Sequence, residues 1–279
     1  MPTIQQTLIR GFEQLKTTVE SPQLEAELLL AHVMDSSRTQ LRTWPERVLT
    51  EQQLTTYSML IDKRLHGQPI AYLIGKQGFW SLDLMVTSHT LIPRPETELL
   101  VELALDRIPV DCHWRIADLG TGTGAIALAL AQERPLCQFL ATDKFDDALE
   151  VARENARENN ITNIQFIKSN WFEKLLTHPP FHMIVSNPPY IPQADPHLQQ
   201  GDVRFEPDSA LVSGVSGLDD IASIIQQSTA HLKKDAWLLI EHGYDQSEAV
   251  VNLMQTSLFH SISDINDLNQ QPRVIMGRK

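Results

Sequence analysis

The strongest constraint on the fold is an alternation of apolar, strand-like segments with helical segments, which runs from residue 94 to the end of the chain. Such an alternation is typical of a mostly parallel β-sheet covered by helices on both faces. We therefore expect an α/β fold with a Rossmann-like sheet. The expected strands lie within 114–119, 137–143, 164–171, 182–190 and 236–244, followed by a terminal hairpin made of 259–265 and 273–277.

The first 75 residues carry helical patterns instead. One helix is expected to begin with Ser21 as its N-cap and Pro22 in its first turn. A second helix is expected over 51–66, with Gly67 as its stop signal. The positions predicted to face the core are Leu24, Leu28 and Ala31 in the first helix and Leu54, Tyr57, Ile61 and Leu65 in the second.

These patterns divide the chain into three parts. We expect an N-terminal helical domain over 1–75, a connecting β-hairpin over 76–90 and the sheet domain over 91–279. The hairpin is expected because apolar and polar residues alternate from Trp80 to Thr87. The apolar runs are too short to cross a bilayer, and the N-terminus lacks a basic segment followed by a hydrophobic one. The sequence therefore predicts a cytoplasmic protein that does not span a membrane.

The distribution of charge argues against a nucleic-acid partner. The formal net charge is −12, and residues 89–279 carry 15 Lys and Arg against 26 Asp and Glu. A protein that grips nucleic acid needs basic side chains to neutralise phosphates, and no run of them occurs. A small-molecule or protein substrate and a monomeric state are expected. The two cysteines and ten histidines show no metal-ligand spacing, so no metal is expected.

A glycine-rich segment, GTGTG at 120–124, lies between the first predicted strand of the sheet and the helix after it. Glycines there let the backbone approach a ligand closely, although a tight strand-to-helix turn alone also explains them. Asp143 ends the next strand, 19 residues after Gly124. A carboxylate at that place can accept hydrogen bonds from both hydroxyls of a ribose. Together the two features predict a cofactor that contains a nucleoside.

Two further strand ends carry polar and aromatic residues. After the third strand, Asn170 can hydrogen-bond the edge of an adenine and Trp171 can cover its face, although a tryptophan here also fits a core position. After the fourth strand, Asn187 precedes two prolines and Tyr190. Prolines can simply mark the end of a strand, but they do not explain a polar amide held beside an aromatic ring. Ligands in such sheets bind at the carboxyl ends of strands, where all these residues are expected.

Four segments together resemble a known family: IPRPETE at 92–98, DLGTGTGAIALALA at 118–131, SNPPYI at 186–191 and DVRFEP at 202–207. They are similar to the class I methyltransferases that use S-adenosylmethionine, and within them to the N(5)-glutamine methyltransferases that act on peptide chain release factors. The resemblance covers nearly the whole chain, including the helical domain and the hairpin. The chain departs from the family at Asn170, where an acidic residue is usual, and in DINDLNQQP, where DYxGNER is common.

The resemblance implies methylation of the glutamine in the Gly-Gly-Gln motif of release factors 1 and 2, on its side-chain amide nitrogen. An amide nitrogen is a poor nucleophile, so we expect activation mainly through positioning. The side-chain oxygen of Asn187 and the backbone carbonyl of Pro188 are implied to accept the two N–H bonds of the amide. Tyr190 is implied to pack against its plane, and Pro189 to complete the substrate site.

The implied cofactor is S-adenosylmethionine, with S-adenosylhomocysteine as product and no metal. The residues implied to bind it are Gly120, Thr121, Gly122, Thr123, Gly124, Asp143, Asn170, Trp171 and Asn187.

Two other functions stay open from the sequence. An adenine-N6 nucleic-acid methyltransferase fits Asn187 to Tyr190 equally well, because the exocyclic amine of adenine presents the same NH2 group. Enzymes of that kind flip a base into the site and usually carry basic contacts for the target, which this sequence lacks. The other is a non-catalytic binding protein that keeps the fold.

Overall fold

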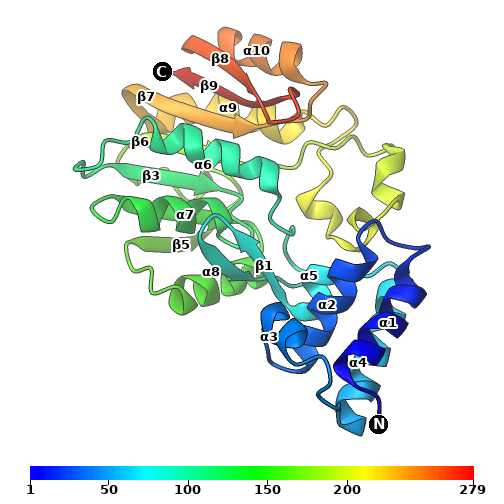
Figure 1. Ribbon diagram of the computed structural model, residues 1–279. Helices are drawn as coiled ribbons and strands as arrows, with labels where there is room; N and C mark the ends of the chain where they lie inside the picture. Colours follow the sequence, from blue (N-terminus) through cyan, green and yellow to red (C-terminus); the bar gives the residue numbers. More distant parts are fainter. The chain divides into compact units, whose positions relative to one another are not determined.

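The computed structural model describes all 279 residues and divides into two compact units. The first unit holds Met1–Lys76 together with His197–Phe205, and the second holds Gln77–Pro196 and Glu206–Lys279. None of the helices is both long enough and apolar enough to cross a lipid bilayer. The two units are described in turn below (Figure 1).

Five helices build the first unit: α1 (Ile4–Leu15), α2 (Pro22–Val33), α3 (Arg38–Thr43), α4 (Glu51–Leu65) and α5 (Ile70–Ile74). Capping boxes start α1, α3 and α4. In each box the side chain of the N-cap residue (Thr3, Ser37 or Thr50) accepts from the backbone N–H of a glutamine three residues later, and the side chain of that glutamine accepts from the backbone N–H of the N-cap residue. The helices enclose a single apolar cluster that includes Leu15, Leu29 and Ile61.

The buried face of α2 differs in part from the prediction, because Ala31 is buried as expected but Leu24 is not. The helix begins at Pro22 as expected, but the Ser21 side chain makes no capping hydrogen bond. Leu24 is 39% exposed, whereas Leu29 and Leu30 are fully buried. Apolar residues lie on nearly every side of α2, so their spacing does not single out one face. Packing against α1, α4 and α5 selects the face that is buried.

A segment that follows the fourth predicted strand, 197–205, belongs to the helical unit. Arg64 Nη1 donates to Asp202 Oδ1 at 3.0 Å, and Arg204 Nη2 donates to the backbone carbonyl of His66 at 3.0 Å. Gly67 adopts φ of +92°, and a Cβ there would lie 1.9 Å from Arg204 Nη2. The glycine therefore ends α4 and also leaves room for this arginine.

The second unit is built on a seven-stranded sheet in the order β5-β4-β3-β6-β7-β9-β8. The strands are β3 (Arg115–Leu119), β4 (Gln138–Asp143), β5 (Ile164–Lys168), β6 (Phe181–Ser186), β7 (Leu232–Glu241), β8 (His260–Asn266) and β9 (Pro272–Arg278). Strands β3 to β7 pair in parallel, and β9 is antiparallel to both of its neighbours. The predicted α/β class and the terminal hairpin are confirmed.

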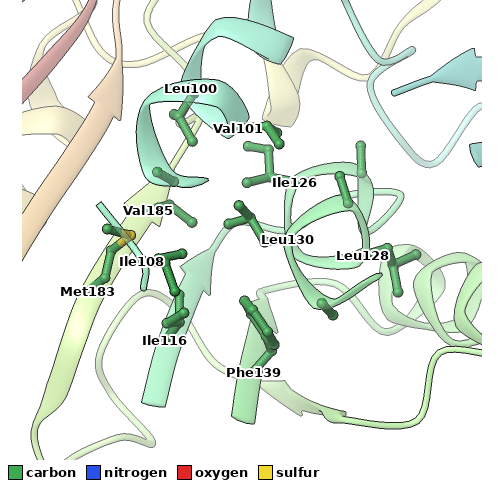
Figure 2. Packing of buried hydrophobic residues seen from close by; sticks show 14 of the residues in the cluster. Leu100, Val101, Ile108, Ile116, Ile126, Leu128, Leu130, Phe139, Met183 and Val185 are labelled. Carbon is green, nitrogen blue, oxygen red and sulfur yellow. The ribbon is translucent and has the colours of Figure 1, made fainter. Parts of the chain in front are cut away.

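Helices cover both faces of this sheet. One apolar cluster joins β3, β4 and β6 to α6 (Glu98–Leu105) and α7 (Ala125–Glu133); Figure 2 shows Leu100, Ile126 and Val185 within it. The other cluster packs the opposite face against α9 (Asp219–His231) and α10 (Ser247–Thr256). Helix α10 was not predicted, and its sequence mixes β-branched residues with Asn and Thr, which are weak helix formers.

A β-hairpin, made of β1 (Lys76–Phe79) and β2 (Leu82–Met85), joins the helical segment to the sheet along the chain. Asn155, on α8 (Asp146–Glu158), links β2 to the glycine-rich turn through hydrogen bonds. Its Nδ2 donates to the carbonyls of Met85 at 3.0 Å and Thr123 at 2.9 Å, and its Oδ1 accepts from Met85 N at 2.6 Å. Asn155 is completely buried, so water cannot replace these partners.

We predict that Asn155→Ala lowers the free energy of unfolding by about 2–4 kcal/mol, because it leaves buried backbone groups without partners. Urea denaturation followed by circular dichroism measures the change. Asn252→Ala, an exposed amide on α10, is the matched control and should change stability by less than about 0.5 kcal/mol. Equal stability of the two variants would contradict the role given to Asn155.

Candidate active site

The register of the sheet brings four strand ends to one edge. Leu119 of β3 lies opposite Thr142 of β4 on one side and Ser186 of β6 on the other. Asp143 of β4 in turn lies opposite Lys168 of β5. The segments that follow these strands therefore meet at the carboxyl edge, beside the point where the strand order reverses around β3.

A cavity of about 230 Å³ opens at this edge. Of the residues predicted for the site, it is lined by Gly120, Thr121, Gly122, Thr123, Asp143, Asn170, Trp171, Asn187 and Pro189. Gly124, Pro188 and Tyr190 are not among its lining residues. The structure thus brings the glycine-rich turn, the acidic strand end and Asn187 together around one space.

The glycine-rich turn bends through three residues with positive φ: +71° at Gly120, +54° at Gly122 and +85° at Gly124. A Cβ on Gly120 would lie 3.0 Å from the Trp171 ring, while a Cβ on Gly122 would meet no atom within 4 Å. Gly122 thus leaves open space where it borders the cavity. Gly124 instead allows close packing, because a Cβ there would lie 3.0 Å from the side chain of Leu128 in the first turn of α7.

Asp143 holds the turn from the neighbouring strand. Its Oδ2 accepts from Gly122 N and its Oδ1 from Phe145 N, both at 3.0 Å. Burial raises the pKa of Asp143, and these backbone hydrogen bonds oppose the shift. Each carboxylate oxygen can accept more than one hydrogen bond, so Asp143 keeps acceptor capacity for a ligand in the cavity.

Asn170 and Trp171 form another wall of the cavity, and acidic side chains orient both of them. Asn170 Nδ2 donates to Glu173 Oε1 at 3.1 Å, and Trp171 Nε1 donates to Asp220 Oδ1 at 3.1 Å. The side-chain oxygen of Asn170 makes no hydrogen bond within the protein. It is therefore available as an acceptor for a ligand in the cavity.

Asn187 follows β6 directly, and the end of that strand is fixed by Ser186 Oγ, which donates to Leu119 O at 2.7 Å. The side-chain nitrogen of Asn187 donates to Thr97 Oγ1 at 3.0 Å. Its side-chain oxygen accepts no hydrogen bond within the protein. An amide is thus held at the cavity with an unused acceptor.

Tyr190 lies against the protein interior. Its hydroxyl donates to Glu241 Oε1 at 3.4 Å, and its backbone carbonyl accepts from Gln246 Nε2 at 3.0 Å. Burial raises the pKa of Tyr190, and the nearby Glu241 adds to the shift. In this arrangement Tyr190 anchors the turn that follows Asn187.

Sequence reasoning missed several residues of the site. Arg94 and Thr97 line the cavity from the segment IPRPETE, to which the sequence assigned no role in the site. Glu206 holds that segment, because it pairs with Arg94 and accepts a hydrogen bond from Ile92 N at 3.2 Å. Phe145, two residues after Asp143, also lines the cavity. The quoted motifs were the only signal that pointed to the first two.

Asp118, a buried acid in β3, hydrogen-bonds with a residue of the glycine-rich turn. Asp118 Oδ2 accepts from Thr121 Oγ1 at 2.6 Å, whereas its Oδ1 has no hydrogen-bond partner. Burial raises the pKa of Asp118 to about 7. No group of three or more His, Cys, Asp or Glu side chains is arranged to hold a metal ion.

Comparison with known proteins gives the class. Residues 95–202 match the profile of the methyltransferase small domain, and residues 6–75 match the PrmC N-terminal domain. The fold is similar to the crystal structure of a methyltransferase from Pyrococcus furiosus, with a TM-score of 0.55, 18% identity, and coverage of 80% of this chain and 98% of that one. Fold and site together define a class I methyltransferase.

Curated relatives give the family. A release factor glutamine methyltransferase from Escherichia coli is 48% identical over 274 residues, which is 98% of each chain. The Pseudomonas aeruginosa protein of the same name is 50% identical over 258 residues, 92% of this chain and 93% of the relative. The chain belongs to the release factor glutamine methyltransferase family.

Proposed function

We propose that this enzyme transfers a methyl group from S-adenosylmethionine to the side-chain amide nitrogen of the glutamine in the Gly-Gly-Gln motif of release factors 1 and 2. The observation that carries the proposal is Asn187, whose amide is held at the cavity with its oxygen free to accept a hydrogen bond. Family membership supports the substrate. Release factors act on ribosomes, so the proposal places the enzyme in the cytoplasm.

The cavity offers what a nucleoside-containing cofactor requires. Gly122 leaves space for close approach of a ligand, and Asp143 keeps acceptor capacity suited to ribose hydroxyls. The free oxygen of Asn170 suits the exocyclic amine of adenine. When bound, S-adenosylmethionine supplies an electrophilic methyl group on a positively charged sulfur. The glycine-rich turn, Asp143, Asn170 and Trp171 are the residues we propose to hold it.

The substrate amide must be oriented, because its lone pair is delocalised into its carbonyl. We propose that Asn187 Oδ1 and the backbone carbonyl of Pro188 each accept one of its two N–H bonds. Two fixed acceptors align the nitrogen and stabilise the positive charge that develops on it during transfer, and the nitrogen then loses one proton to solvent to give the neutral N-methyl amide. The prolines restrict the backbone, so little conformational entropy is lost when the amide binds. Tyr190 would contribute through this same turn.

We predict that Asp143→Ala raises the dissociation constant of S-adenosylmethionine roughly tenfold to hundredfold, the cost of losing hydrogen bonds to a charged acceptor. Isothermal titration calorimetry measures it. Asp146→Ala, which removes an exposed acid at the start of α8, is the matched control and should bind the cofactor normally. An unchanged dissociation constant in Asp143→Ala would contradict the proposal that Asp143 binds the ribose hydroxyls of the cofactor.

The activity is tested by incubating the nuclease-treated enzyme with purified release factor and labelled S-adenosylmethionine. We expect one methyl group on the Gly-Gly-Gln glutamine, located by peptide mass spectrometry. Asn187→Ala should lower the single-turnover rate by roughly 10²–10³-fold, the scale of a lost transition-state hydrogen bond, with cofactor affinity largely retained. Asn252→Ala should match the wild type. Label on adenine of added DNA, or on no acceptor at all, would contradict the proposal.

A further inference from the structure

We propose that Cys112 and Cys137 form a redox-reactive pair, which a peroxide converts into a disulfide that the native fold accommodates. Both residues are free thiols in the structure, and neither lines the cavity of the active site. The inference concerns a second, separate site of covalent modification. It therefore does not depend on the proposed function.

The pairing of β3 with β4 brings the two cysteines together. Arg115, the first residue of β3, lies opposite Gln138, the first residue of β4. Cys137 comes directly before this paired position, and Cys112 comes three residues before it. The two thiols therefore lie where these strands begin, at the amino edge of the sheet, whereas the cavity opens at the carboxyl edge.

The two sulfur atoms are already in contact. They lie 3.5 Å apart, and Cys137 Sγ also lies 3.4 Å from the backbone carbonyl oxygen of Cys112. Both backbones are held in turns, since Cys112 N donates to Pro109 O at 3.3 Å and Cys137 N donates to Arg134 O at 3.0 Å. Asn163 Nδ2 donates to Cys137 O at 3.1 Å. A disulfide bond is about 2.0 Å long, so the sulfurs need to approach by only about 1.5 Å, which rotation of the side chains can supply.

The surroundings of the two thiols differ and assign the order of reaction. Cys137 is 1% exposed, whereas Cys112 is partly exposed. Burial raises the pKa of Cys137 to about 11, and its hydrogen bond with Cys112 adds to the shift. Because the thiolate is the reactive form, Cys137 is a poor first nucleophile. A peroxide from solvent therefore reacts first with Cys112.

The reaction has two steps. Cys112 gives up its proton and its sulfur attacks one oxygen of hydrogen peroxide, so that an S–O bond forms, the O–O bond breaks and the released hydroxide takes up the proton to leave as water. The sulfur of Cys137 then attacks the sulfenic acid sulfur of Cys112 and displaces hydroxide, which leaves as a second water with the proton of Cys137. The two thiols together lose two electrons to the peroxide. Contact between the sulfurs favours this second step over further oxidation.

The disulfide would close a loop across a sequence separation of 25 residues. This loop contains β3, the glycine-rich turn and α7. A cross-link restricts the unfolded chain, so it stabilises the folded state if the native geometry accommodates it. We expect the oxidised enzyme to unfold at a temperature about 5–10 °C above that of the reduced enzyme.

The first test uses the wild-type, full-length enzyme. The reduced protein is treated with hydrogen peroxide, the remaining thiols are alkylated with N-ethylmaleimide, and peptides are analysed by mass spectrometry. We expect a peptide pair linked through Cys112 and Cys137 within one molecule, which dithiothreitol separates. Alkylation of both cysteines, a link between two molecules, or Cys112 oxidised to a sulfinic acid without a link would each overturn the proposal.

Two variants test the order of reaction and the fit to the fold. Cys137→Ser should accumulate a sulfenic acid on Cys112, which dimedone labels, whereas the wild type should be labelled weakly. Cys112→Ser is the matched control, because peroxide should neither label its Cys137 nor raise its melting temperature in circular dichroism. Equal dimedone labelling of the wild type and Cys137→Ser would overturn the proposal. So would an oxidised wild type that melts no higher than the reduced one.

Discussion

The site depends on one constraint, the register in which β3 pairs with β4 and β6. Leu119 lies level with both Thr142 and Ser186, so the glycine-rich turn, Asp143 and Asn187 all emerge at the same height on one edge. A slip by one residue would turn the side chains of a strand to the opposite face. The two apolar clusters that cover the sheet specify this register, because each strand buries alternate residues in each cluster.

Two acids are buried near this edge of the sheet, and their burial lowers the stability of the folded state. Asp118 and Glu241 are buried, and the pKa of each is raised to about 7. Because their pKa values are raised on folding, the unfolded chain releases these protons first, and the two groups reduce the stability of the folded state as the pH rises from about 4 towards 7. Residues that break the usual rules of burial in this way are expected where function requires them.

The sequence revealed the parts of the fold and site that depend on local pattern. Apolar runs predicted where the strands lie, and the residues that follow the strand ends predicted Gly122, Asp143 and Asn187 as site residues. It could not reveal partners that meet only in three dimensions: Thr97 and Asn187 are 90 residues apart in the chain. The segment 197–205 joined the helical unit for a similar reason, since its ion pair with Arg64 spans 138 residues. The buried face of α2 was predicted only in part, because its apolar residues lie all around the helix.

The account thus comes down to the orientation of one amide. X-ray maps at ordinary resolution do not separate the nitrogen and oxygen of an asparagine side chain, but neutron diffraction locates the deuterium atoms. The direct measurement is a neutron structure of crystals grown with S-adenosylhomocysteine and glutamine. We predict that the ND2 group of Asn187 points at Thr97 and that its oxygen lies about 3 Å from the glutamine side-chain nitrogen. An Asn187 ND2 group turned towards the glutamine, or a glutamine amide bound away from Asn187, would contradict the account.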